Sequence, residues 1–131
     1  MTKILCIAIG GAAGSLLRYF LGGIVQRSWD GWQGWFFPAG TLLINVTGCL
    51  VIGMLAALFS GPVALREEYR VGLMVGLLGG FTTFSSFGLE TFHLLSDGQR
   101  LAAAANVVLS CGLGIAAVMV GYWVAERMLS A

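Results

Sequence analysis

A run of small and hydroxyl-bearing residues interrupts the third long apolar stretch of the sequence. The segment GLLGGFTTFSSFGLETF covers residues 76–92. At its centre lie Gly79, Gly80, Thr82, Thr83, Ser85 and Ser86. If this stretch crosses a membrane, irregular backbone at that depth is tolerated only where protein buries it or where it lines a polar cavity, and broken helices commonly present backbone groups to ions. We therefore expect a helix break within residues 79–83. The alternative is a continuous helix whose hydroxyls bond back to the preceding turn.

Two phenylalanines follow this run at helical spacing. Phe84 and Phe87 are three residues apart and share a helix face, with Ser86 and Glu90 on an adjoining strip. The edge of an aromatic ring carries a positive partial charge. Two ring edges in a pore can attract an anion without holding it too tightly, since conduction requires that the ion also leave easily. The alternative is that the two rings simply pack in a core or face lipid.

Polar residues also recur four positions apart in two other apolar stretches. Thr41 and Asn45 share a face of the second stretch, and Asn106 and Ser110 share a face of the fourth, which Gly114 extends. An amide in hydrocarbon needs a partner, so Asn45 either bonds across a helix interface or donates to a passing ligand. Polar stripes on three helices favour one shared hydrophilic track over three unrelated interhelical bonds.

Two ionisable side chains belong to the same set of candidates. Arg18 lies late in the first stretch, where a charge is either functional or extends along the helix to the interface. Glu90 lies one turn from the only histidine, His93, near the end of the third stretch, and could face a vestibule. The sequence contains no Ser/His/Asp grouping, no pair of carboxylates and no phosphate-binding glycine loop, so it does not predict an enzyme.

The elements that must position these residues are transmembrane helices. The chain has 131 residues, of which 58% are hydrophobic and 10% charged, whereas about a quarter of the residues in soluble domains are charged. Four stretches reach the roughly 20 residues of a spanning helix: 4–25, 38–59, 71–95 and 101–125. We expect residues 1–131 to form a single all-α domain of four transmembrane helices. A formal charge of +1 provides no basic face for nucleic acid.

Charge and glycine content predict association in the membrane. Lys3, Arg66, Arg70 and Arg127 would lie on one side of a four-span chain and Arg27 and Arg100 on the other. Since Lys and Arg bias sets orientation, so small an excess permits insertion either way up and antiparallel pairing of two copies. The sequence has 20 glycines. Several step by four residues, which lets helices approach closely: Gly10 and Gly14, then Gly72, Gly76 and Gly80.

Three segments together resemble the Fluc (CrcB) family of small four-helix fluoride channels. GGAAGSLLRYF (residues 10–20) is similar to the family's glycine and arginine signature in the first helix. PAGTLLINVTG (38–48) is similar to its GT-N-G segment, and GLLGGFTTFSSF (76–87) to its GGxTTFSTF run. The resemblance covers nearly the whole chain. It implies an antiparallel, dual-topology homodimer in the bacterial inner membrane, with the third helix broken at mid-membrane and two pores that pass F⁻ passively, protecting the cell from fluoride toxicity.

The same resemblance assigns roles to individual residues. Those matching the fluoride pore are Phe84, Phe87 and Asn45, with Thr41, Ser86 and Ser110 matching its polar track. Gly79 and Thr82 match the positions whose backbone carbonyls hold a structural Na⁺ at the dimer interface. Arg18 matches an arginine at a vestibule or with a structural role. Ser86 replaces the threonine of many members, and Asn106 stands where some members have a tyrosine or another polar residue.

Two functions of other classes compete with a channel. A proton-coupled exporter of the small multidrug-resistance type also has four short helices, but it uses a carboxylate deep in the first helix, and residues 4–25 contain none. A structural membrane subunit would not need three polar stripes together with a broken helix.

Overall fold

The computed structural model describes residues 1–33, 36–61 and 65–130, and all the regular secondary structure in these ranges is helical. The elements are α1 (Thr2–Gln33), α2 (Ala39–Ser60), α3 (Glu67–Val71), η1 (Gly72–Leu78), α4 (Gly79–Phe81), α5 (Phe84–Ser96) and α6 (Arg100–Ser130). By length and composition, four segments can cross a membrane: Thr2–Asp30, Ala39–Ser60, Glu67–Ser96 and Arg100–Ser130. The expectation of an all-helical protein with four membrane-spanning segments is therefore confirmed.

The first helix is longer than the hydropathy pattern suggests. The predicted first span covers residues 4–25, which leaves residues 26–37 as the expected connection to the second. The first part of that expectation is wrong, because α1 continues through Gln33. The Gln26 side chain explains part of the extension. Its Nε2 donates to Asp30 Oδ1 at 2.8 Å and to the Phe37 carbonyl at 2.9 Å, and its Oε1 accepts from the Gly40 amide at 3.1 Å. Gln26 thus ties the end of α1 to the start of α2.

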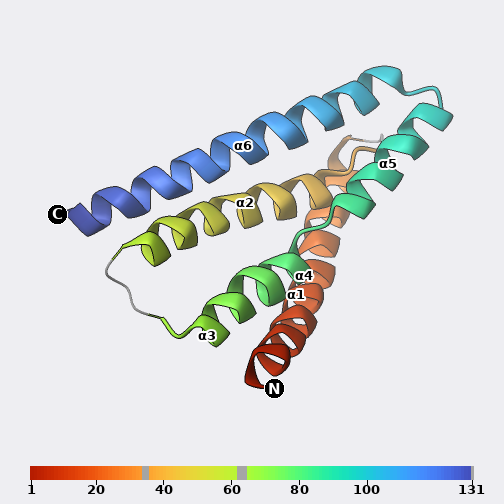
Figure 1. Cartoon of the computed structure of the whole chain (residues 1–131). Coiled ribbons are helices and arrows are strands. Elements are labelled where there is room, and N and C mark those ends of the chain that lie inside the picture. The colour runs from red at the N-terminus through yellow and green to blue at the C-terminus, as the bar shows by residue number, and fades with distance from the viewer. Residues whose placement is uncertain (34–35, 62–64, 131) are drawn as a thin grey trace.

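The helices associate as two pairs (Figure 1). Helices α2 and α6 lie side by side, and α1 packs against η1 and α4. Small residues make both contacts close. A Cβ added to Gly10 would come within 2.5 Å of the Gly72 carbonyl oxygen, and one added to Gly80 within 2.5 Å of the Gly11 oxygen. In the other pair, a Cβ on Gly121 would collide with the Leu50 carbonyl. The expected role of glycine in helix packing is confirmed.

The third span changes backbone geometry twice. Residues Gly72–Leu78 form a π-helix, a conformation that is rare and is often found at functional sites. After the short α4, Thr82 has φ −84° and ψ 156°, and Thr83 has φ −150° and ψ 115°, so both residues are extended. Helix α5 begins at Phe84, and the Thr83 hydroxyl caps it by accepting from the Ser86 amide. Within residues 79–83, the backbone is therefore helical up to Phe81 and extended at Thr82 and Thr83.

Helices α5 and α6 form a hairpin that fixes the last two spans relative to one another. Gly98 has φ +75°, a conformation that L side chains rarely adopt, and it provides the turn. Leu94, Ala102 and Ala103 form a buried cluster at this end. The polar contacts between α5 and α6 described below lie along the same hairpin.

Candidate functional site

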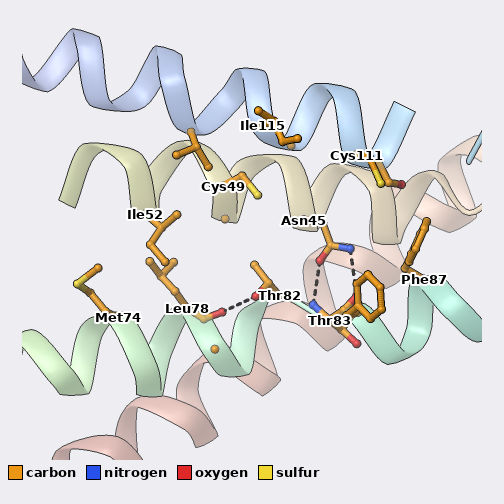
Figure 2. Close-up of a pocket in the computed structure, with 16 residues that line it drawn as sticks. Asn45, Cys49, Ile52, Met74, Leu78, Thr82, Thr83, Phe87, Cys111 and Ile115 are labelled. Carbon is orange, nitrogen blue, oxygen red and sulfur yellow. Dashed lines mark hydrogen bonds between the residues drawn. The ribbon is translucent and has the colours of Figure 1, made fainter. Parts of the chain in front are cut away.

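The two extended residues are held by one side chain of the second span. The Thr83 amide donates to Asn45 Oδ1 at 2.8 Å, and Asn45 Nδ2 donates to the Thr83 carbonyl at 3.1 Å. Figure 2 shows this pair of hydrogen bonds between α2 and the extended backbone. An amide side chain matches a peptide group in donor and acceptor geometry, so Asn45 satisfies the backbone where the helix ends. Of the two roles considered for Asn45, the structure displays the interhelical bond.

This arrangement diverts two amides from their usual helical acceptors. In a continuous helix, the amide of residue 83 would donate to the carbonyl of Gly79, and that of residue 86 to the carbonyl of Thr82. Here the Thr83 amide donates to Asn45, and the Ser86 amide donates to the Thr83 hydroxyl at 3.2 Å. The carbonyls of Gly79 and Thr82 therefore lose the donors that an unbroken helix would provide.

A pocket of 470 Å³ lies beside the extended residues, between α2, α6 and the third span (Figure 2). Most of its lining is apolar. The residues assigned from the sequence that line it are Asn45, Gly79, Thr82, Phe84, Phe87 and Ser110. Three of the four apolar stretches thus meet in a single pocket that combines an amide, hydroxyls and two aromatic rings. We refer to this as the phenylalanine pocket.

The two phenylalanine rings contact each other at the edge of this pocket. Their centroids are 5.3 Å apart with an interplanar angle of 46°, within the range of favourable tilted aromatic pairs. The Phe84 side chain is 82% exposed, whereas Phe87 is partly buried. Phe87 is therefore the ring that this chain itself surrounds, and Phe84 is presented to lipid or to another chain.

A second pocket of 620 Å³ lies on the other side of Thr83. It gathers four more of the residues predicted for the track and vestibule: Arg18, Thr41, Ser86 and Glu90. Thr41 donates to Glu90 Oε1 at 2.7 Å, while Glu90 Oε2 is buried without a hydrogen-bond partner among the described residues. Thr83 lines both pockets. We refer to this second pocket as the arginine pocket.

Asn106 is the one candidate that lines neither pocket. Its side chain is buried, with 1% exposure, and its Nδ2 donates to Thr91 Oγ1 on α5 at 2.9 Å. Ser110, one turn along α6, donates to Asn106 Oδ1 at 3.3 Å. Asn106 is therefore not part of the wall of the phenylalanine pocket, but it is hydrogen-bonded to Ser110, which is.

Sequence reasoning gave no role to three residues that organise the site. Thr83 connects the two pockets and caps α5, Thr91 bonds Asn106, and Gln26 joins α1 to α2 and lines the arginine pocket. In the sequence, Thr83 is one of several adjacent hydroxyl-bearing residues, and Gln26 directly follows the predicted first span. Their interhelical partners lie 38, 15 and 14 positions away for Thr83, Thr91 and Gln26 respectively, so spacing within one helix carries no signal for these bonds.

Comparisons with known proteins place the chain among membrane channels. The model of the family described as CrcB-like protein, Camphor Resistance (CrcB), matches residues 5–122. The chain is 44% identical to a protein of Methylobacillus flagellatus over the whole length of both, and 48% identical to one of Chloroflexus aurantiacus over 92% of this chain and 93% of that one. A Methylococcus capsulatus protein is 46% identical over 96% of this chain, and this chain spans only 54% of the length of that protein. All three are named fluoride-specific ion channel FluC. The family model and these relatives, which match nearly the whole chain, show that this chain belongs to the CrcB family.

Proposed function

We propose that this chain is a fluoride-specific ion channel that lets F⁻ cross the bacterial inner membrane down its electrochemical gradient, and so protects the cell from fluoride. The observation that carries this proposal is the near full-length identity of 44–48% to proteins named as fluoride-specific channels. The residues expected in a fluoride path also line two adjoining pockets that meet at Thr83.

The chemistry of the two pockets suits a small, strongly hydrated anion. A narrow path must replace the water around fluoride with other hydrogen-bond donors. Asn45 can offer its second Nδ2 hydrogen, Ser86 and Ser110 offer hydroxyls, and the rings of Phe84 and Phe87 offer positive edges. Arg18 in the arginine pocket would raise the local concentration of anions by long-range attraction. Because none of the donors in the phenylalanine pocket carries a full charge, the ion can leave again.

The efflux of halides from proteoliposomes tests this function. With valinomycin present so that K⁺ can leave and keep the charge balanced, we expect vesicles loaded with potassium fluoride to release F⁻ through the purified protein without a pH gradient. Vesicles loaded with potassium chloride are expected to retain Cl⁻ under the same conditions. Selective passive flux would separate a channel from a proton-coupled exporter, whose transport depends on a proton gradient. Absence of fluoride release by folded protein would contradict the proposal.

We further propose that the working unit is an antiparallel, dual-topology homodimer with two pores, in which the third span is broken at mid-membrane. Phe84, at 82% exposure directly after the extended residues, supports a second chain against this face. A single copy also leaves the phenylalanine pocket walled by only α2, α6 and the third span.

Topology can be tested with cysteines placed at the two ends of the chain. Thr2 and Ser130 would lie on the same side in one copy, so each is replaced by cysteine in a background where Cys6, Cys49 and Cys111 are serine. An impermeant thiol reagent applied to intact cells is expected to label about half of each variant, because half of the copies face each way. Labelling of all copies or of none would show a single orientation and contradict dual topology.

We also propose that Na⁺ binds at the dimer interface to the carbonyls of Gly79 and Thr82. The residues present fit such a group, because both carbonyls have lost their usual helical donors to Asn45 and Thr83, and hard cations favour oxygen ligands. The ion would supply positive charge between the Gly79 and Thr82 carbonyls of the two copies and so stabilise the dimer. Thermal stability of the dimer should be higher in sodium than in N-methyl-D-glucamine salts of equal ionic strength. Equal stability in both would count against the site.

A further inference from the structure

A chain of hydrogen bonds runs from the phenylalanine pocket into the α5–α6 interface. Ser110 Oγ lies 3.3 Å from Asn106 Oδ1, Asn106 Nδ2 lies 2.9 Å from Thr91 Oγ1, and Thr91 Oγ1 lies 2.7 Å from the Phe87 carbonyl oxygen. Ser110 and Phe87 both line the pocket, whereas Asn106 does not. The chain therefore starts and ends at pocket residues but passes through the protein between them.

The direction of every bond in this chain follows from its last member. A carbonyl oxygen only accepts, so the single hydroxyl hydrogen of Thr91 is given to Phe87. Thr91 Oγ1 must then accept from Asn106, which places the NH₂ group of Asn106 toward Thr91 and its oxygen toward Ser110. An amide oxygen only accepts, so Ser110 is the donor. Thr91 thus determines where the Ser110 hydrogen points.

We propose that Asn106 and Thr91 are positioning residues that hold the Ser110 hydroxyl hydrogen away from the pocket until fluoride competes for it. This inference rests on the proposed fluoride channel. At rest, Ser110 presents lone pairs to the pocket, which disfavours an anion. To bind fluoride, Ser110 must turn its hydrogen from Asn106 to the ion and leave a buried amide oxygen unpaired, which is unfavourable. The long 3.3 Å separation makes this exchange feasible. The net effect is a site that fluoride enters and leaves readily.

A double-mutant cycle between Ser110 and the two positioning residues tests this coupling. In the wild-type background, Ser110→Ala should lower fluoride efflux by no more than about threefold, because the gain from donating to fluoride is offset by the loss of the bond to Asn106. With Asn106→Leu, Ser110 no longer has this competing acceptor. There the same Ser110→Ala change should lower efflux about three- to tenfold further than it does in the wild-type background.

Thr91 offers matched variants with smaller changes in shape. Thr91→Val removes the hydroxyl that orients Asn106 and should reproduce the coupling of Asn106→Leu, whereas Thr91→Ser keeps the hydroxyl and should retain the wild-type pattern. Thr47→Val is the control, since Thr47 also bonds the carbonyl four residues before it, at 2.8 Å, but takes no part in this chain. If every double variant lowers efflux by the product of the two single effects, within about twofold, the residues are not coupled and the proposal is overturned.

Nuclear magnetic resonance tests the same series of hydrogen bonds without measuring fluoride transport. The sequence has two asparagines, Asn45 and Asn106, so ¹⁵N-asparagine labelling gives two side-chain amide signals. We expect fluoride to shift the Asn106 signal in the wild type and not in Ser110→Ala, with chloride as the inert control. A fluoride shift that persists in Ser110→Ala would show direct contact with the ion and overturn the inference, as would a wild-type shift confined to Asn45.

These outcomes separate the inference from the function on which it rests. If the wild-type protein releases fluoride but the effects of the paired substitutions simply multiply, the positioning role is excluded and the channel function stands. A folded wild-type protein that neither releases fluoride nor shifts either asparagine signal excludes the channel itself, and the inference with it.

Discussion

Replacing Asn45 by aspartate is expected to reduce fluoride efflux by about 100-fold or more, the largest effect of any single substitution considered. Aspartate has nearly the same shape but no NH₂ group, so it loses the bond to the Thr83 carbonyl that Asn45 makes at 3.1 Å. A carboxylate there would also face that carbonyl oxygen and repel an anion in the phenylalanine pocket. Leaving the Thr83 carbonyl without its neutral amide donor costs about 1–3 kcal/mol, and repulsion between the new carboxylate and the anion adds to this.

The neutral variant Asn45→Ser separates the two causes. It loses the paired hydrogen bonds to Thr83 but adds no charge, so we expect it to retain more flux than the aspartate variant. Efflux from proteoliposomes is measured for both, after gel filtration has shown that each remains folded. Wild-type rates for a folded Asn45→Asp protein would show that Asn45 is neither close to the ion path nor needed to hold the extended residues.

Phe87→Ile is expected to lower fluoride efflux by about tenfold or more. Isoleucine fills much of the same apolar volume, so the packing around this partly buried side chain is largely kept. It has no ring edge with positive partial charge, and it removes the tilted contact with Phe84 at 5.3 Å. An aromatic pair contributes about 0.5–1.5 kcal/mol beyond its buried area. Losing that contribution should leave the protein folded, so a drop in efflux would reflect a defect in conduction.

Phe92→Ile provides the matched control for this variant. Phe92 lies on the same helix, α5, but it is 62% exposed and lines neither of the two pockets. Efflux through Phe92→Ile should remain within about twofold of the wild type, the small effect typical of exposed substitutions. Full flux through a folded Phe87→Ile protein would remove the aromatic ring from the conduction mechanism.

The sequence predicted the features that depend on local pattern. Hydropathy gave the four spans because apolar length is a property of each segment alone. The four-residue spacing of Gly10 and Gly14, and of Gly76 and Gly80, indicated close helix packing, since such a repeat places glycines on one helix face. The adjacent Thr82 and Thr83 indicated the place where the backbone becomes extended.

The remaining features depend on partners that are distant along the chain. The division of the polar track into two pockets arises because Thr83 lies between them, with Asn45 bonded to its backbone. The link from Asn106 to Thr91 joins two helices across 15 positions, and no periodicity within either helix encodes it. The π-helical segment Gly72–Leu78 likewise packs against α1, a partner distant in the sequence, and Gly76 approaches Ile7 there.

The bond between Asn45 and Thr83 also constrains how the protein is made. Ribosomes deliver α2 before the third span exists, so the Asn45 amide is synthesised 38 residues ahead of its partner. An unpaired amide is costly in hydrocarbon, and the extended backbone at Thr83 is costly there for the same reason. Each of the two spans has polar groups, the Asn45 amide or the Thr83 backbone, that only the other span satisfies. They are therefore expected to wait beside the insertion machinery and to pass into the lipid together, as a joined pair.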